Sequence, residues 1–368
     1  MHLRENKIIK RMGLIMLVLA LAVSCMACGS SDTDDPDENE TGTETSAASS
    51  SSSDEEASVS FEAMDTYMTI TVYGNNAEAA AAAAQEEVER LDILFSAENS
   101  ESEIYTINEN GGGTLSDESA YLVETSLSLW ESTGGAFDIT VYPIAQLWGF
   151  IGGDFYVPTD EELEELLGLV GSDMVGWDSS SNTITLEEGM AIGLGGIAKG
   201  YTGDRLLEIF KEYGVDGAIA SLGGNIVIYG DKPSGQSWKV AIQDPEDSSS
   251  YVCVLALDDD LSIVTSGGYE RYFEEDGVTY HHILDPDTGY PADAGLISVS
   301  IISADGTEAD GLSTSLFVMG TEAAIEFWQT TEDYDFEMIL VDSDGNIYIS
   351  EGLVDSFSGD NTATVVYK

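Results

Sequence analysis

The segment "GAIASLGGNIVIYG", Gly217–Gly230, decides the fold class. It holds two apolar, strand-like runs that glycines separate and end, a composition typical of β-strands bounded by turns. Further strand-like runs follow it: "WKVAIQDP" (238–245), "YVCVLALDD" (251–259), "LSIVTSGG" (261–268), "VTYHHILDP" (278–286), "GLISVSIISAD" (295–305) and a closing hairpin (334–352). Because these strands mostly follow one another, the sequence predicts an α+β fold with largely antiparallel or mixed sheets and peripheral helices.

Helices are expected around this strand-rich region. The alanine-rich segment 76–95 places Val88, Leu91 and Leu94 on one face, which is typical of an amphipathic helix. Before it, residues 58–74 alternate apolar and polar side chains, as a half-buried strand does. Further helices are expected at 116–132, 160–167, 197–213, from 310 onward and at 322–330.

The N-terminus reads as an export signal and a tether. Residues 1–28 have a basic start and a short apolar run, about ten residues against the roughly 20 needed to span a bilayer. Their end, "LAVSCMACGSS", is similar to a lipobox with Cys28, or alternatively Cys25, as the acylated residue; an ordinary signal peptide is the other interpretation. Residues 29–58 are polar and acidic and are expected to be a disordered tether. The folded domain is expected at 59–368, anchored by lipid outside the cytoplasm.

Charge excludes polyanionic partners. All but one of the 69 acidic residues, but only eight of the twelve Lys and Arg, lie beyond the leader. Such a surface repels nucleic acid and anionic lipid, so neither is an expected ligand. Cys253 is the one cysteine beyond the lipobox pair and, being flanked by valines, is expected to be a buried structural thiol.

A glycine-rich segment with a lysine is the first candidate site. "IGLGGIAKGYTGDR", Ile192–Arg205, runs into a predicted helix, where backbone amides and Lys199 could contact a phosphate. It has no G-K-[ST] ending and is not a Walker loop. Plain packing of the glycines is the alternative.

A second candidate is the pair Asp310 and Thr314 in "TEADGLSTS". If Asp310 opens a helix, these residues lie on one face and direct two oxygens to one point, as Mg²⁺ prefers. An Asp N-cap followed by an ordinary helical Thr is the alternative.

The third candidate is the adjacent pair His281 and His282, the only histidines besides His2. In a strand their rings point to opposite faces, so at most one serves a given site. The alternative interpretation is a structural histidine that is buried and hydrogen-bonded. Arg271 beside a glycine pair and the aromatic run after Phe137 could also contact a ligand, although such aromatic residues more often belong to a core.

Taken in order, six segments resemble the ApbE family of FAD:protein FMN transferases. They are "GGAFDITVYPIAQLWGF", "GLGGIAKGYTGDR", "SLGGNI", "TSGGYERYF", "HHILDPDTGYP" and "ADGLSTSLFVMG". The likeness covers roughly residues 61–330. It implies an ApbE-like, T-fold-like catalytic domain that cleaves FAD with Mg²⁺ and joins FMN through a phosphoester to a threonine of an acceptor protein, releasing AMP.

The resemblance also implies roles for particular residues. Mg²⁺ would be held by Gly196, Asp310 and Thr314. His282 would be the catalytic base, with Asp285 orienting it or sharing its role. The residues expected to contact FAD are Met64, Ala136, Phe137, Asp138, Lys199, Arg271 and Ile283.

Two positions depart from the family pattern. Asp65 stands where glycine usually follows the methionine, and Gly193 stands where an acidic residue commonly precedes the glycine pair. The loss of that carboxylate puts affinity for the adenosine half of FAD in doubt. Two alternatives therefore stay open: an FAD pyrophosphatase that yields FMN and AMP, and a non-catalytic FAD-binding lipoprotein.

Overall fold

The structure is a computed structural model that describes residues 55–359 and 362–368. The predicted leader and nearly all of the predicted tether lie outside these residues. The first strand, β1 (Glu56–Ala63), begins three residues before the expected start of the domain at 59. None of the helices in the described ranges is both long enough and apolar enough to cross a membrane.

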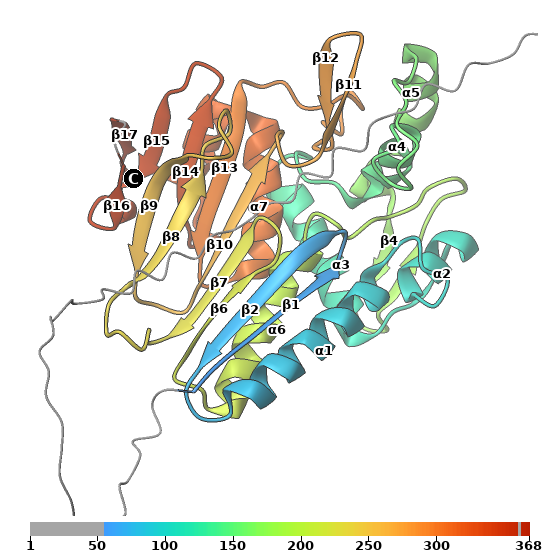
Figure 1. The fold of residues 1–368 in the computed structure, drawn as a ribbon. Coiled ribbons are helices and arrows are strands. Elements are labelled where there is room, and N and C mark those ends of the chain that lie inside the picture. The colour runs from blue at the N-terminus through green and yellow to red at the C-terminus, as the bar shows by residue number, and fades with distance from the viewer. Residues whose placement is uncertain (1–54, 360–361) are drawn as a thin grey trace, which may run out of the picture. The chain divides into compact units, whose positions relative to one another are not determined.

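A nine-stranded sheet forms the centre of the domain, in the order β1-β2-β6-β7-β10-β13-β14-β15-β17 (Figure 1). All of its neighbouring strands are antiparallel except β15 and β17, which confirms the predicted α+β class. After β1, its strands are β2 (Thr66–Tyr73), β6 (Gly217–Ser221), β7 (Asn225–Gly230), β10 (Leu261–Gly267), β13 (Leu296–Ser303), β14 (Glu337–Asp342), β15 (Ile347–Ser350) and β17 (Ala363–Val366).

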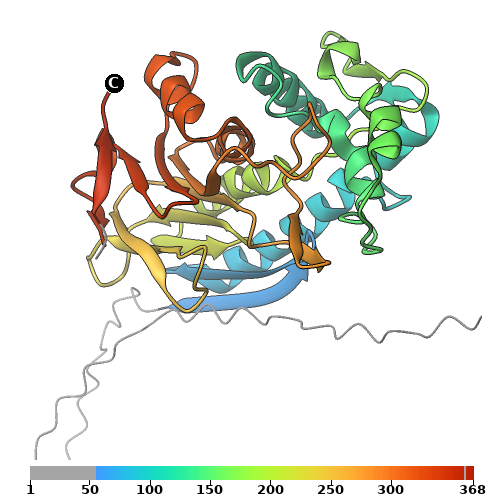
Figure 2. The same ribbon diagram turned by 90° about the horizontal axis from the view of Figure 1, so that it is seen from above.

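Helices cover one face of this sheet, and a small sheet covers the other. Figures 1 and 2 show α1 (Ala77–Phe95), α6 (Ala198–Tyr213) and α7 (Gly306–Met319) on the same side. On the opposite face, β8 (Trp238–Gln243), β9 (Tyr251–Leu257) and β16 (Phe357–Ser358) share an apolar cluster with β7, β10 and β13. Cys253 is fully buried in that cluster as a free thiol, and burial raises its pKa to about 12.

The sheet, α6, α3 (Asp117–Ser132) and α8 (Thr321–Thr330) enclose α7, so its buried residues lie on all sides of the helix.

Most of the remaining elements are short and lie in the first half of the chain. The other elements are α2 (Glu103–Asn110), β3 (Gly112–Thr114), η1 (Ile139–Val141), α4 (Tyr142–Leu147), α5 (Asp160–Leu167), η2 (Ser172–Met174), β4 (Gly176–Asp178), β5 (Thr183–Thr185), β11 (Tyr272–Glu275), β12 (Val278–His281) and η3 (Glu351–Leu353).

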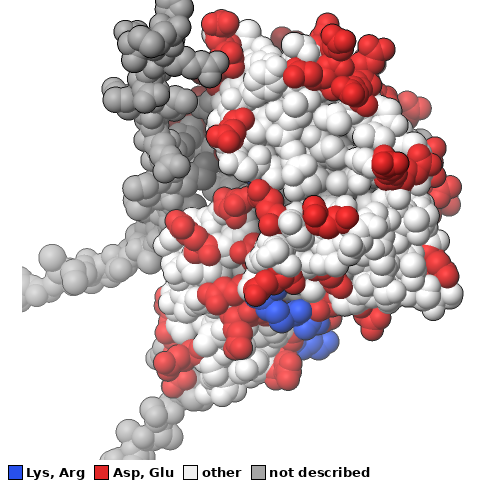
Figure 3. Space-filling model, turned by 90° about the vertical axis from the view of Figure 1, so that its right-hand side faces the viewer, with Lys and Arg blue, Asp and Glu red and all other residues white. Residues whose placement is uncertain are grey.

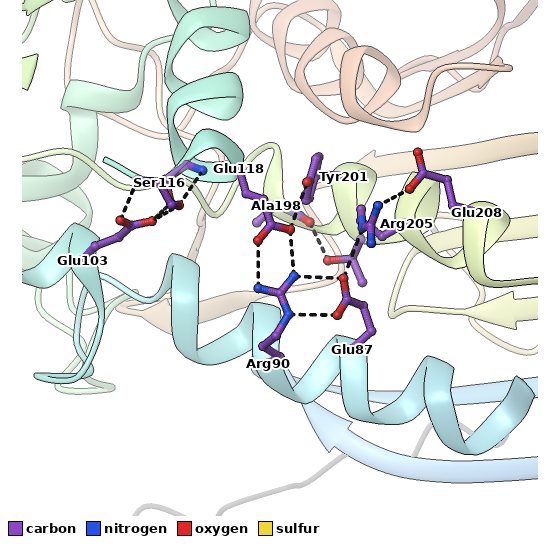
Figure 4. Close-up of polar contacts among 11 residues, drawn as sticks. Glu87, Arg90, Glu103, Ser116, Glu118, Ala198, Tyr201, Arg205 and Glu208 are labelled. Atoms are coloured by element: carbon purple, nitrogen blue, oxygen red, sulfur yellow. Dashed lines mark hydrogen bonds and ion pairs between the residues drawn. The ribbon is translucent and has the colours of Figure 1, made fainter. Parts of the chain in front are cut away.

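An ion-pair network ties α6 to α1 and α3 (Figure 4). The Arg90 guanidinium pairs with Glu87 and Glu118 at 2.8 and 2.7 Å, and Arg205 pairs with Glu87 at 3.1 Å and with Glu208. Each such surface pair contributes at most about 1 kcal/mol, so the network mainly orients the helices. Around it, acidic side chains far outnumber basic ones on the face shown in Figure 3.

The starts of α6 and α7 lie in direct contact. A Cβ placed on Gly200 would lie 2.1 Å from the Gly306 carbonyl oxygen, so only glycine fits there. Asp204 completes the junction, because its carboxylate accepts hydrogen bonds from the amides of Gly306 and Thr307 at 2.7 and 2.8 Å. Burial raises the pKa of Asp204 to about 6.

This raised pKa predicts a measurable pH dependence of stability. Between its ordinary value of 3.8 and about 6, Asp204 holds a proton only in the folded state, so its contribution to the unfolding free energy falls as pH rises through that window. Relative to an Asp204→Asn variant, the wild type should lose at most about 3 kcal/mol between pH 4 and 7. Urea unfolding across this range measures the difference. Exposed Asp259→Asn is the control, and an Asp204→Asn difference that stays constant with pH would contradict the assignment.

Candidate functional site

Lys199 is the common neighbour of the main candidate residues. It lies in the first turn of α6, close enough for its charge to act on Asp310, Glu270 and His282. Burial raises the pKa values of the two carboxyl groups and lowers that of His282; the ammonium charge opposes the first effect and adds to the second. These three side chains come from α7, from the loop after β10 and from the segment after β12. The fold therefore brings Asp310 and His282, 28 positions apart in the chain, within reach of the charge of one ammonium group.

His282 lies just beyond the end of β12, and its ring is held in one orientation. Its backbone amide donates to the carbonyl oxygen of Arg271 at 3.1 Å, and its Nδ1 lies 3.1 Å from the same oxygen. Burial, and then the charges of Arg271 and Lys199, lower its pKa to about 3. The ring is therefore neutral, Nδ1 carries the hydrogen that faces the carbonyl, and Nε2 keeps its lone pair for an incoming proton.

His281 has different surroundings. Its Nε2 lies 3.1 Å from the Ala292 carbonyl oxygen, and its ring packs edge-on against Phe317 with centroids 5.5 Å apart. Burial lowers its pKa. His281 thus packs against α7, whereas the ring of His282 contacts the Arg271 carbonyl and lies near Phe150, so the two imidazoles do not share a site.

Asp285 does not orient His282. Its carboxylate accepts a hydrogen bond from the Asp287 amide at 2.9 Å, and its amide donates to the Tyr290 carbonyl at 2.8 Å. Among the residues that the structure describes, no hydrogen bond joins Asp285 to His282. The side chain shapes the turn after the histidine, and the orienting group is the carbonyl of Arg271.

Asp310 lies in the second turn of α7, because the helix is capped by Asp305, whose side chain accepts from the Glu308 amide. The N-cap alternative for Asp310 is therefore wrong. Its buried carboxylate instead accepts from the Gly200 amide at 2.8 Å, at the start of α6. The Gly200 amide is consequently occupied by Asp310, and a phosphate near this end of α6 would depend on the Lys199 ammonium.

The residues suit a magnesium ion that takes few protein oxygens. A Cβ on Gly196 would lie 4.0 Å from Thr314 Oγ1, so the glycine loop lies beside the hydroxyl, which is also 3.5 Å from Ser266 Oγ. Burial raises the pKa of Asp310, so a cation at this carboxylate would offset the cost of its charge. Within the described ranges no three acidic, histidine or cysteine side chains cluster as a ready cation cage. Mg²⁺ binds through few carboxylates, with phosphate and water completing its shell, so this donor set fits.

Sequence reasoning missed two residues of the site. Asn225 is 2% exposed and lies beside Asp310, but neither amide atom of its side chain has a partner in hydrogen-bonding geometry. Glu270 is crowded by protein atoms yet still reaches solvent, and burial raises its pKa to about 7. Both lie in segments that carry the family resemblance, "SLGGNI" and "TSGGYERYF". Neither stands in a local sequence pattern that would identify it as a site residue before the fold is known.

Arg271 links the site to the first hairpin. Met64 and Asp65 form the β1–β2 turn, with φ values of 48° and 58°. Thr202 Oγ1 donates to Met64 Sδ at 3.8 Å, and Arg271 Nη2 lies 3.7 Å from Asp65 Oδ2. The aspartate that departs from the family pattern thus gives Arg271 an acidic partner, while the guanidinium also donates to the carbonyl of Phe150.

The segment Ala136–Asp138 is held in position by the packing of Phe137 and by hydrogen bonds to Asp138. The buried ring of Phe137 packs against the glycine loop, where a Cβ on Gly196 would lie 3.0 Å from it. The buried Asp138 carboxylate accepts hydrogen bonds from Thr140 and Ser172, which hold this segment in place. Ile283 is likewise buried in the main core, and Ala136 is half-buried.

Tyr142 fills the space beside Gly193. A Cβ on this glycine would lie 2.6 Å from Tyr142 Cδ2, so no larger residue fits while the ring stays in place. Burial raises the pKa of Tyr142 to about 12, and the Gln146 amide donates to its hydroxyl at 3.1 Å. The Tyr142 ring therefore occupies the space that a side chain at position 193 would need.

This packing predicts an asymmetric effect of two alanine substitutions in one loop. Gly193→Ala should lower the unfolding free energy by about 1–3 kcal/mol, because the new methyl group overpacks the Tyr142 ring. Gly195→Ala is the matched control, since a Cβ there meets no atom within 4 Å. Urea denaturation measures both variants, and equal stabilities would contradict the packing.

A cavity of about 600 Å³ lies near Tyr142 but contains none of the residues expected to bind metal or flavin. Its walls are formed largely by α2 and by residues 186–191, and they include Asn108, Glu109, Gln146, Glu187 and Glu188. The convergence of charged and polar groups around Lys199, rather than this volume, defines the candidate site.

Comparison with known proteins identifies the class. Solved structures with the same fold include the ApbE protein of Thermotoga maritima, at TM-score 0.75 and 34% identity over 81% of this chain and 98% of that one. The flavin transferase ApbE of Vibrio cholerae matches at TM-score 0.73 and 26% identity over 82% and 99% of the two chains.

The particular family follows from the sequence. The ApbE family model matches residues 64–340, and a Treponema pallidum protein named FAD:protein FMN transferase is 33% identical over 79% of this chain and 85% of its own length. A Klebsiella pneumoniae protein of the same name is 32% identical over 80% and 91% of the two chains. The chain belongs to the ApbE family.

Proposed function

We propose that this protein is an FAD:protein FMN transferase that moves the FMN portion of FAD onto a threonine hydroxyl of an acceptor protein. Family membership and the names of its relatives support the transferase activity. The observation that carries the proposal is that the charge of Lys199 acts on both the neutral His282 and the buried Asp310. A base, a cation and a metal-binding carboxylate around one point suit the transfer of a phosphoryl group.

In this reaction the threonine oxygen bonds to the phosphorus of the FMN half as the pyrophosphate P–O bond to AMP breaks. The hydroxyl proton passes to His282 Nε2, which is free because Nδ1 faces the Arg271 carbonyl. Lys199 neutralises part of the negative charge of the pyrophosphate. Asp310, Thr314 and the carbonyl of Gly196 would hold Mg²⁺, which when bound neutralises the pyrophosphate and stabilises the departing AMP.

The low pKa of the free His282 ring matches this role. Burial, and then the charges of Arg271 and Lys199, keep the ring unprotonated before the substrate binds. When FAD is bound, its phosphates offset these two charges, and the basicity of Nε2 rises at the moment a proton must be accepted. The same two cations thus bind the anionic substrate and prepare the base.

The cellular setting is part of the proposal. The leader, with Cys28 or Cys25 at its end, supports export and lipid anchoring, so acceptors would be exported or membrane-bound redox proteins. This segment lies outside the described residues.

Release of AMP with and without an acceptor tests the function. The protein is incubated with FAD and Mg²⁺, and AMP is measured by chromatography in the presence and absence of a flavin-carrier domain that a related transferase modifies. AMP formation that depends on the acceptor is expected. Equal AMP formation without acceptor would indicate a pyrophosphatase, and bound flavin without AMP in either assay would indicate a flavin-binding protein.

A further inference from the structure

The hairpin β11–β12 stands apart from the main sheet (Figure 1). Its two strands pair only with each other, and its base carries the groups that form the site. Arg271 precedes β11, and His282 follows β12. Since side chains alternate along a strand, Arg271, Phe273, Tyr280 and His282 share one face of the hairpin.

Three aromatic rings connect this face to solvent, and we call Phe150, Phe155 and Phe273 the aromatic ledge. Phe150 lies 6.5 Å from the His282 ring and 6.0 Å from Phe155, and Phe155 stacks on Phe273 at 4.9 Å with an interplanar angle of 19°. Phe155 is 48% exposed, whereas Phe150 is buried. An unbroken row of rings therefore leads from an exposed aromatic side chain to the candidate base.

The ledge has an acidic rim, which we define as Asp154, Glu275 and Asp276; all three are exposed. Glu275 is close enough to the neighbouring Tyr156 to contribute to its raised pKa, after the larger effect of the Tyr156 hydrogen bond to Glu162. An exposed aromatic surface with such a rim attracts a partner that combines apolar and basic side chains.

We infer that the aromatic ledge docks the acceptor protein, through an extended segment with an apolar side chain for Phe155 and a Lys or Arg for the rim. The inference rests on the proposed function, and continuity with the site supports it. A segment seated on Phe155 and Phe273 leads along the aromatic row toward His282 Nε2, so a hydroxyl residue further along it can reach the base. The ledge thus selects the protein substrate, while Lys199 and Asp310 act on FAD.

Substitution at the exposed end of the ledge tests this. Phe155→Ser should raise the KM for the flavin-carrier domain about tenfold while the dissociation constant for FAD, measured by flavin fluorescence, stays within twofold. Glu275→Lys, a surface variant expected to fold, should also raise the KM for the carrier, and added salt should raise the wild-type KM because it screens the rim. Tyr251→Ser is the matched control, since Tyr251 is 57% exposed on β9 of the separate small sheet.

The outcomes separate this inference from the function on which it rests. A wild type that modifies the carrier, with Phe155→Ser and Glu275→Lys equal to it, would overturn the docking role alone. Weakened FAD binding with an unchanged KM for the carrier would assign the ledge to the flavin and also overturn docking. A wild type that transfers no FMN would overturn the proposed function.

Discussion

Replacing His282 with alanine is expected to lower the rate of FMN transfer by about 10² to 10⁴, the usual contribution of a general base. The variant keeps Lys199, Asp310 and the aromatic ledge, so binding of FAD and of the acceptor should persist. The reason for the loss is chemical: without Nε2, the attacking hydroxyl has no neutral base beside it. Single-turnover transfer of FMN, followed by the mass of the acceptor, measures the effect.

The neighbouring histidine supplies the control. His281→Gln keeps a nitrogen donor for the Ala292 carbonyl and should transfer FMN at nearly the wild-type rate. In the wild type, the low pKa of the free His282 ring places the acid limb of kcat/KM for FAD below pH 6.5, the ordinary pKa of histidine. Wild-type transfer by His282→Ala, or equal losses in both variants, would remove the assignment of the base.

Asp310→Ala is expected to reduce Mg²⁺-dependent transfer by about 10³, because a metal ion on a phosphoryl group contributes several kcal/mol to the barrier. The carboxylate is the one charged side chain expected to hold the ion, and Thr314 offers only a neutral hydroxyl. The substitution also leaves the Gly200 amide without its acceptor, so stability should fall as well.

Two measurements separate these effects. Calorimetric titration with Mg²⁺ in the presence of FAD measures metal binding independently of turnover. Urea unfolding measures stability. Glu308→Gln, two residues earlier on α7 and partly exposed, serves as the control. An Asp310→Ala protein that is folded and binds Mg²⁺ like the wild type would contradict the proposed metal site.

The strand-rich second half was predictable because its apolar runs are short, β-branched and separated by glycines. That pattern predicted the α+β class and the positions of these strands along the chain, as Gly217–Gly230 illustrates with β6 and β7. Register and neighbours were not predictable from one sequence, since β10 pairs with β7 and β13 across long intervening segments. The separation of β8, β9 and β16 into a small sheet on the opposite face was not predictable either, because their sequences resemble those of the strands in the main sheet.

The site shows the same division. Spacing alone left Asp310 open as a helix cap, and only the position of Asp305 excludes that role. The resemblance placed Asp138 among ligand contacts, and the fold adds hydrogen bonds from Thr140 and Ser172 to its carboxylate, partners that no local pattern indicates. Asn225 becomes a candidate site residue only because it is buried beside Asp310, and this position cannot be predicted from the sequence.

The most direct test of the central claim is the intact mass of a flavin-carrier domain after incubation with the protein, FAD and Mg²⁺. The account predicts an added mass equal to FMN less one water, located on a threonine, with one AMP released per modified carrier and no modification when Mg²⁺ is chelated. A carrier whose mass stays unchanged while FAD is consumed, or remains bound and intact, would contradict it.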